Sequence, residues 1–367
     1  MKITKLHLWQ IGLKSHQAYH MAAGKSCDEV VSIILRLETD SGISGWGEVC
    51  PIPHYLPAYA DGVMPGIAHL APVLLGQDVR HPEVLLAKIN AYLLGHDYIK
   101  SLIDMALYDA AARGAGLPLC NYLGGNFGKP LPLYHSISCI APDEMARIAK
   151  EELAQGMRQF QVKLGADDNH EADIARLVLV REAVGAGPLV YGDWNCGATS
   201  LDATRIGRAV SHLDIMLEQP CETISQCAAV RAATGLAMKL DENVHDVPSL
   251  LAGHAAGCMD VAALKLSKFG GVSALRKARD LCVSLGVKMC IEDTWGSDIT
   301  TSAALHLGAS TTPKYVMNVC DLSAYVSPKL DENLPVRQNG TISPPSGDGL
   351  GVTPDLDRLG SAHMVLD

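Results

Sequence analysis

The sequence has no apolar segment long enough to cross a bilayer, no secretory signal at its start and no Cys-x-x-Cys pair. Its eleven cysteines are scattered, and those in apolar runs, such as Cys282 and Cys290, are typical of small buried side chains in a reducing compartment. Positive charge is also scarce, since the formal net charge is −10. This balance disfavours a nucleic-acid backbone or an anionic membrane as partner. We therefore expect a soluble, cytoplasmic protein.

The length and composition indicate two domains of the α/β class. A chain of 367 residues is too long for one ordinary domain and fits two, one of them the size of a barrel. Hydrophobic residues make up 48% and charged residues only 19%, which suits parallel strands covered on both faces. No internal repeat exceeds the length of one strand and one helix.

Three carboxylates stand at the ends of short apolar runs that read as buried strands. Asp193, Glu218 and Asp241 close the runs 189–193, 215–218 and 237–241, and they recur about every 24 residues, the length of one strand-helix unit. The carboxyl ends of successive parallel strands meet at one mouth of a barrel. Three carboxylates would repel one another there, so a divalent cation is their natural partner.

Two lysines extend this pattern on other predicted strands. Lys163 closes the run 160–163 and Lys265 closes the run 261–265. A single charged residue after a strand is most often a helix cap or a surface charge. Five charged residues in register at strand ends favour an active site instead. The alternative is a non-catalytic barrel that only binds a small acid. In such a barrel at least one of these five charged residues would be missing, whereas all five are present here.

These motifs resemble the enolase superfamily, in its muconate-lactonizing branch, over essentially the whole chain. The resemblance implies that Asp193, Glu218 and Asp241 bind one Mg²⁺ and that Lys163 and Lys265 are an acid/base pair. One departure is Gln161, where the branch usually has a lysine. The segments that carry the resemblance are Gln161-Val-Lys163, Asp193-Trp-Asn195, Glu218-Gln-Pro220, Asp241-Glu242 and Lys265-Leu-Ser-Lys-Phe-Gly-Gly271.

The expected fold is a (β/α)7-8 TIM-like barrel with an N-terminal α+β capping domain. We place the capping domain at residues 1–125, completed by the tail 326–367, and the barrel at 126–325. The barrel strands begin with 133–138 and continue past Lys265 with 288–293 and 315–321. Two stretches of the cap, 14–27 and 50–62, read as loops, the first of them mobile. In the resembled family such loops close over the barrel mouth.

The substrate is a small carboxylate, and the resemblance narrows it further. Relatives acting on α-amino acyl groups hold the ammonium with Asp-x-Asp on the last strand, whereas Asp321-Leu-Ser323 keeps one carboxylate. The sequence is thus similar to the cis-3-hydroxy-L-proline dehydratases, with 2-epimerisation competing. The alternative is a 2-epimerase of proline betaine or hydroxyproline betaine, with Trp295 and Tyr55 facing a quaternary nitrogen. A dipeptide epimerase fits less well.

The remaining predictions concern neighbouring residues and assembly. Our candidate substrate-binding residues are Tyr55, Asn195, Asp293, Trp295 and Asp321. Glu292 and Asp293 either position Lys265 or cap the next helix, and Lys268 and Glu242 are either supporting partners or surface charges. We expect a homo-oligomer.

Overall fold

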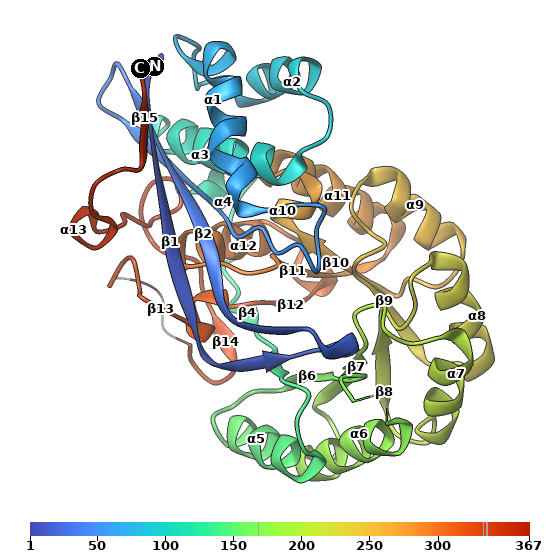
Figure 1. The fold of residues 1–367 in the computed structure, drawn as a ribbon. Helices are drawn as coiled ribbons and strands as arrows, with labels where there is room; N and C mark the ends of the chain where they lie inside the picture. Colours follow the sequence, from blue (N-terminus) through green and yellow to red (C-terminus); the bar gives the residue numbers. More distant parts are fainter. Residues whose placement is uncertain (168, 333, 335–336) are drawn as a thin grey trace.

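The computed structural model describes residues 1–167, 169–332, 334 and 337–367. Three antiparallel strands, β1 (Ile3–His20), β2 (Ser26–Thr39) and β3 (Ser44–Val49), open the chain. The tail adds two strands to the same sheet, since β13 (Val326–Ser327) and β15 (Met364–Leu366) both pair with β1. The two terminal segments of the chain therefore belong to the same sheet, with Leu6 paired to Leu366 (Figure 1).

Four helices follow: α1 (Val63–Leu74) and α3 (Asp97–Gly114) pack against this sheet, while α2 (Pro82–Tyr92) and α4 (Leu119–Tyr122) pack on α3. In α3, Ile99, Leu102 and Ala106 lie on one face at helical spacing, and all three are buried. Strand β3 approaches α3 so closely that a Cβ on Gly45 would lie 2.1 Å from the carbonyl oxygen of Ala106. Only glycine permits that contact. We call the sheet with α1–α4 the cap.

The second part of the chain is a barrel-like sheet of parallel strands. Within the described residues its order follows the sequence over eight strands, and an isolated parallel bridge between Leu133 and Val319 joins its two edges. The predicted barrel strands are thereby confirmed to within a few residues. They are β5 (His135–Ile137), β6 (Gln159–Lys163), β7 (Leu189–Asp193), β8 (Ile215–Glu218), β9 (Ala237–Leu240), β10 (Val261–Lys265), β11 (Lys288–Glu292) and β12 (Val316–Val319).

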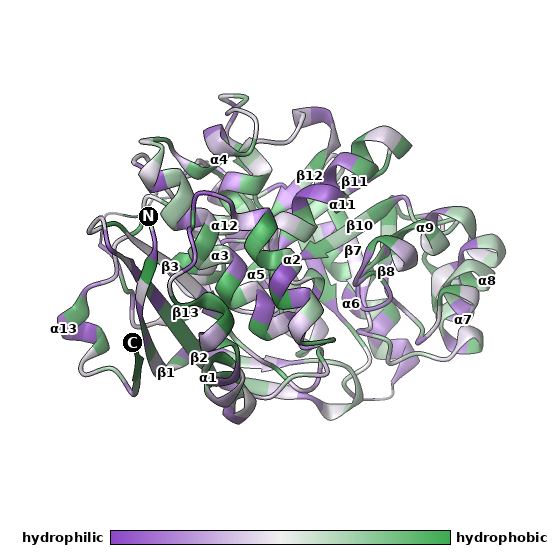
Figure 2. Cartoon of the chain, turned by 90° about the horizontal axis from the view of Figure 1, so that it is seen from above, coloured by the Kyte–Doolittle hydropathy of each residue, from purple (hydrophilic) through white to green (hydrophobic). Residues whose placement is uncertain are grey.

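Helices surround these strands, and their sequences carry polar and apolar residues together, as Figure 2 shows for α7, α8 and α9. Several begin with a side-chain cap, for example Thr223 before α8 and Asp246 before α9. The helices are α5 (Pro142–Ala154), α6 (His170–Val184), α7 (Ser200–Ala209), α8 (Ile224–Thr234), α9 (Val247–Ala255), α10 (Leu266–Phe269), α11 (Val272–Leu285) and α12 (Asp298–Ala309).

The smaller elements are β4 (Leu131–Pro132), which pairs with β14 (Thr341–Ile342), and α13 (Leu356–Leu359) in the tail. The cysteines are free thiols, and Cys282 and Cys290 are fully buried, as predicted. None of the described helices combines the length and apolar character needed to cross a membrane. The domain boundaries proposed at residues 125 and 325 stay predictions.

The prediction that residues 14–27 form a mobile loop is wrong. Strand β1 continues to His20 and β2 begins at Ser26, so the two strands pair almost to the tip, with Tyr19 opposite Cys27 after a register shift. We call residues 14–27 the hairpin end. It bends across the barrel mouth toward β6 and β7 (Figure 1). The predicted loop 50–62 contains no helix or strand over 50–59, as expected, but it ends in a short 3-10 helix, η2 (Ala60–Gly62).

Candidate active site

The structure brings the five predicted charged residues together at the carboxyl end of the barrel-like sheet. Lys163, Asp193 and Glu218 are direct neighbours across β6, β7 and β8. Asp241 follows β9 and Lys265 ends β10. All five side chains are buried, with relative exposures of 0–9%. Burial of this many charges is tolerated only where they pair with one another or with an ion.

Lysines contact all three carboxylates, beginning with Asp193 and Asp241. The Nζ of Lys163 lies 2.5 Å from Asp193, and Asp241 is contacted by Lys265 at 2.6 Å and by Lys268 at 2.8 Å. Burial alone would raise the pKa of Asp241, but the ammonium groups of Lys265 and Lys268 lower it well below its usual range. Burial likewise opposes the charge on Lys163, yet Asp193 raises the pKa of that lysine. Lys268 is thus a direct partner of Asp241.

Glu218 is held from two sides. Gln161 donates from Nε2 to one oxygen at 2.7 Å, and the Nζ of Lys239 lies 2.8 Å from the other. Lys239 is fully buried inside the barrel and also lies 5.2 Å from the ring centroid of Tyr191. Burial raises the pKa of Glu218 to about 8, and the attraction of Lys239 only partly offsets this.

The charge balance around the site fits a divalent cation. Six carboxyl side chains face four lysines, so acidic groups outnumber basic ones by two, and a bound cation would favour the ionised form of those whose pKa is raised. Glu242 accepts from Asn195 at Oε1, but its Oε2 is buried without a hydrogen-bond partner, and burial followed by repulsion from Asp241 raises its pKa to about 7. The groups are Asp193, Glu218, Asp241, Glu242, Glu292 and Asp293, with Lys163, Lys239, Lys265 and Lys268.

Within the described residues no three acidic, histidine or cysteine side chains already form a metal cluster. The reason is visible in the contacts, because Lys163 and Lys265 occupy oxygens of Asp193 and Asp241. The oxygen-only donor set and the surplus of acidic groups nevertheless suit Mg²⁺, which prefers carboxylate and water ligands. Asp193, Glu218 and Asp241 are the residues that would hold it.

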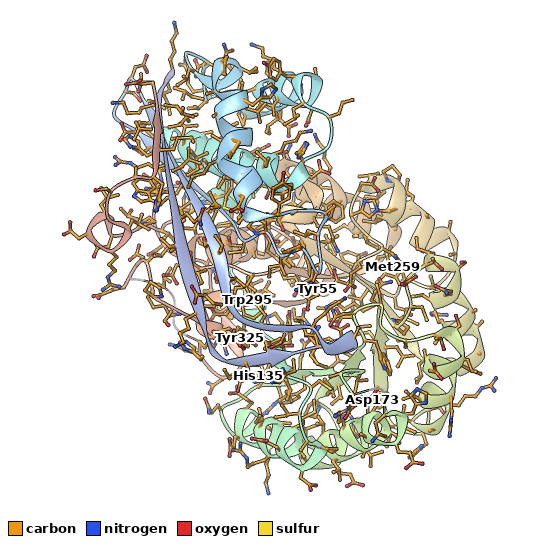
Figure 3. The ribbon with its side chains drawn as sticks, in the orientation of Figure 1. Tyr55, His135, Asp173, Met259, Trp295 and Tyr325 are labelled. Atoms are coloured by element: carbon orange, nitrogen blue, oxygen red, sulfur yellow. The ribbon has the colours of Figure 1, made fainter. Side chains whose placement is uncertain are left out.

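Some of these groups line a cavity, together with five aromatic side chains. Its charged lining residues are Lys163, Asp241, Lys265, Glu292 and Asp293. Tyr55, Trp295 and Tyr325 lie beneath the long strands of the cap sheet in Figure 3 and pack with the hairpin end. The other lining residues are Tyr19, Tyr134, Ser136, Gln161, Thr294, Cys320 and Leu322.

The predicted substrate-binding residues separate into two groups. Tyr55, Asp293 and Trp295 line the cavity. Asn195 lies below it, where it accepts from Lys163 at 3.1 Å and donates to Glu242 at 3.1 Å. That position makes Asn195 a support for Lys163 rather than part of the cavity wall.

Asp321 does not face the cavity as the sequence suggested. Arg337 donates to its Oδ2 at 2.7 Å and Ser323 donates to its Oδ1 at 2.8 Å, so both oxygens already have partners. Asp293 is the carboxylate that lines the cavity beside Trp295, and burial raises its pKa to about 6. Its oxygens accept from the backbone and hydroxyl of Ser267.

Sequence reasoning missed Lys239, Arg337 and Tyr19. A signal existed for Lys239, because it stands two residues before Asp241 on the same strand and so shares its face. Arg337 lies in an irregular tail, and Tyr19 in a stretch whose pairing depends on contacts with the barrel. Neither position has a local pattern.

Comparison with known proteins agrees with this architecture. The family model described as mandelate racemase / muconate lactonizing enzyme, N-terminal domain, matches residues 5–124. The model described as enolase C-terminal domain-like matches residues 144–358.

Individual relatives cover almost the whole chain. It is 38% identical to a cis-3-hydroxy-L-proline dehydratase of Roseibium aggregatum, over 98% of both chains. It is 30% identical to an L-Ala-D/L-Glu epimerase of Bacillus subtilis, over 96% of this chain and 97% of the relative. A crystal structure of an enolase superfamily member from Roseovarius nubinhibens ISM, complexed with magnesium, superposes with a TM-score of 0.93 at 36% identity, covering 100% of this chain and 99% of the other. The chain belongs to the enolase superfamily, in its mandelate racemase/muconate lactonizing enzyme family, whose relatives here are dehydratases, epimerases and racemases.

Proposed function

We propose that this enzyme removes the proton α to the carboxylate of a proline-like imino acid with the help of Mg²⁺, and that its main reaction is dehydration of cis-3-hydroxy-L-proline. The observation that carries the proposal is that Lys163, Lys265 and Asp241 line one small cavity together. The 38% identity to a cis-3-hydroxy-L-proline dehydratase supports the same substrate class.

The two lysines are placed to act on opposite faces of the substrate. Lys163 ends β6 and Lys265 ends β10, which are four strands apart in the eight-stranded order. One lysine would take the α-proton while the other stands ready to give a proton from the far side. When bound, Mg²⁺ would supply positive charge that stabilises the second negative charge developing on the substrate carboxylate. Asp241, in contact with Lys265, would keep that lysine aimed at the cavity.

Both products follow from the same arrangement. In cis-3-hydroxyproline the hydroxyl and the carboxylate share a ring face, so the α-hydrogen lies on the opposite face from the hydroxyl. Protonation of the hydroxyl by the second lysine would release water. Protonation of the α-carbon from that side would instead give the 2-epimer.

We assign the substrate nitrogen to Asp293 and the rings around it. A secondary ammonium group has N–H donors, and Asp293 is the cavity carboxylate nearest to Trp295 in sequence. Hydrogen bonds from an ammonium group to a carboxylate are charge-assisted and worth roughly twice a neutral one. The Tyr55 ring, 5.6 Å from the Lys265 Nζ, would cover the other side of the substrate ring.

A second candidate is a 2-epimerase of proline betaine or hydroxyproline betaine. Two observations favour it: five aromatic rings line the cavity, and both oxygens of Asp321 are occupied. Tyrosine and tryptophan faces attract a quaternary nitrogen that has no proton to donate.

A single screen separates the candidates. The protein, with Mg²⁺ or with EDTA, is incubated in D₂O with cis-3-hydroxy-L-proline, L-proline and their N,N-dimethyl betaines, and α-deuteration and loss of water are followed by NMR. The main proposal expects Mg²⁺-dependent loss of water from the free imino acid. Faster turnover of the betaines would establish the second candidate.

The metal requirement is tested by Asp241→Asn. Turnover and Mg²⁺ affinity should both be lost, because one ligand charge disappears, while circular dichroism stays unchanged. Asp143→Asn, at an exposed position in the first turn of α5, is the matched control and should behave as wild type. Full activity of Asp241→Asn, or of metal-stripped protein, would contradict the proposal.

A further inference from the structure

A chain of hydrogen bonds runs from the hairpin end to Glu218. The hydroxyl of Tyr19 donates to Ser136 Oγ, Ser136 donates to Gln161 Oε1, and Gln161 donates from Nε2 to Glu218 at 2.7 Å. Ser136, Gln161 and Glu218 are buried, with exposures of 7%, 5% and 0%. The first residue belongs to the cap sheet and the last stands between Asp193 and Asp241 in the strand order.

We propose that Tyr19, Ser136 and Gln161 are positioning residues that couple docking of the hairpin end to Mg²⁺ binding at Glu218. The inference rests on the proposed function, because it takes Glu218 as a metal ligand. It adds that the cap takes part in metal binding without supplying a ligand.

The hairpin end docks on the barrel at several points around Tyr19. The backbone N–H of His20 donates to Ser138 Oγ at 2.8 Å, and Cys139 N–H donates to the His20 carbonyl at 3.0 Å. Further along, Ala23 N–H donates to the carbonyl of Gly165 at 3.1 Å. Docking therefore fixes Tyr19 relative to Ser136, which lies on β5 just before Ser138.

Close packing at the tip makes this docking specific. Ala22 lies against the loop after β7, where a Cβ on Gly197 would approach the Ala22 Cβ to 2.6 Å. The Tyr19 ring also meets Trp295 edge-on, with the centroids 5.7 Å apart. A hairpin end displaced from the barrel would lose these contacts and the Tyr19 hydrogen bond together.

The direction of the hydrogen bonds makes the chain a coupling device. A glutamine amide accepts at its oxygen and donates at its nitrogen, whereas lysine at the same position would only donate. Gln161 can thus join an acceptor, Glu218, to a donor, Ser136. Because the Ser136 hydroxyl donates its hydrogen bond to Gln161, its oxygen is free to accept one from Tyr19.

The coupling acts in both directions. When Glu218 is held in place by a cation, its Oε2 fixes the Gln161 amide, and the oriented Ser136 favours the docked Tyr19. By thermodynamic linkage, docking of Tyr19 must favour cation binding by the same factor. The residues that test this are Tyr19 and Ser136, because neither contacts Glu218 directly.

The experiment measures two quantities in Tyr19→Phe, Ser136→Ala and wild type: the Kd for Mg²⁺ by titration calorimetry, and hydrogen exchange of the amides of residues 14–27 with and without MgCl₂. Couplings of this kind are typically 5- to 150-fold. We expect Mg²⁺ to slow exchange of the hairpin end in wild type, and both variants to bind Mg²⁺ about 5- to 20-fold more weakly and to lose that slowing. The double variant should have a Kd for Mg²⁺ no higher than that of the more affected single variant, because the two residues act in series.

Two controls separate the chain from general damage. Tyr108→Phe removes a buried tyrosine hydroxyl on α3, which donates to Glu83 at 2.9 Å and belongs neither to the cavity nor to the chain. His16→Ala changes an exposed residue of the hairpin end. Both should bind Mg²⁺ as wild type does. Unchanged Mg²⁺ affinity in Tyr19→Phe and Ser136→Ala would overturn the inference and leave the proposed function standing, whereas a wild type that binds no Mg²⁺ would overturn both.

Discussion

Lys163 and Lys265 occupy opposite sides of a ring of eight strands, and each carries a proton close to a carboxylate. If each lysine acts on one face of the substrate, each alanine variant should still exchange the α-proton of one substrate enantiomer. Lys163→Ala and Lys265→Ala should retain exchange for opposite configurations at the α-carbon, measured as deuterium incorporation by NMR in D₂O. Neither variant should epimerise, and dehydration should fall about 10²–10⁴-fold in both, the usual contribution of a positioned acid or base.

Lys150→Ala, an exposed change on α5, serves as control and should keep full activity. A lysine that only steadies negative charge would behave differently: its variant would lose rate yet exchange the α-proton of both configurations. That result would rule out the assignment of two bases.

Two aspartates near the cavity offer a matched pair for locating the substrate nitrogen. Asp293 lines the cavity, although Ser267 and Thr294 already donate to its oxygens. Asp321 is bound by Arg337 and Ser323 and is not among the lining residues. Asp293→Asn should raise the KM for the imino acid about 10- to 100-fold, because a hydrogen bond to a charged group contributes about 1.5–3 kcal/mol. Asp321→Asn should change that KM by less than about threefold. If Asp321→Asn raised the KM more than Asp293→Asn does in steady-state kinetics, Asp321 would be the residue that binds the substrate nitrogen.

The charged residues at strand ends could be predicted because a parallel strand-helix repeat brings each strand end to the same mouth. Asp193, Glu218 and Asp241 depend only on this regularity. The pairing of Asp321 with Arg337 does not, because it depends on how the tail folds back across 16 residues with no periodic pattern. Whether a carboxylate is open to substrate is decided by such distant partners.

At the scale of elements, the hairpin end was the clearest failure of local reasoning. Its residues are mostly polar, and the register shifts between Lys14 and Tyr19, so neither an apolar alternation nor a regular pairing is visible in the sequence. Ser138 and Gly165 of the barrel hold it instead. Strands stabilised by another domain carry little signal of their own.

Strand β3 joins the cap to the start of α12 through one buried carboxylate. Glu48 is fully buried and accepts from the backbone and hydroxyl of both Ser297 and Thr300, at 2.7–3.0 Å. An anion at a helix N-terminus satisfies free N–H groups. Glu48→Gln turns one acceptor oxygen into a donor, so the free energy of unfolding should fall by on the order of 3 kcal/mol.

Denaturant unfolding measures this loss, with Glu29→Gln, an exposed change on β2 of the same sheet, as control. If Glu48→Gln unfolds like the control, the carboxylate does not hold the cap on α12.

At the scale of the whole molecule, the barrel follows from the sequence repeat but the fit between its parts does not. The contacts that join the cap to the barrel link residues far apart in the chain, such as Ser273 N–H donating to Asp104 and Cys139 N–H donating to the His20 carbonyl. No periodic pattern in the sequence predicts such isolated contacts. The two halves of the fold were therefore predictable, and the surfaces between them were not.

Asp104 lies at one of these surfaces, and it makes stability depend on pH. It is fully buried on α3 and accepts from the backbone N–H of Ser273 on α11 at 3.1 Å; burial raises its pKa to about 7, although the Ser273 hydrogen bonds oppose the shift. Because the folded protein binds this proton more tightly than the unfolded chain, the stabilisation is fully present below the ordinary carboxyl pKa and is lost as pH rises through about 7.

Asp104→Asn imitates the protonated form at every pH. It should match wild type near pH 4.5 and exceed it by on the order of 3 kcal/mol at pH 8, in denaturant unfolding at both pH values. Asp97→Asn, an exposed change at the start of the same helix, should show no such difference. If the gap between Asp104→Asn and wild type does not widen as pH rises, Asp104 is not protonated at this surface.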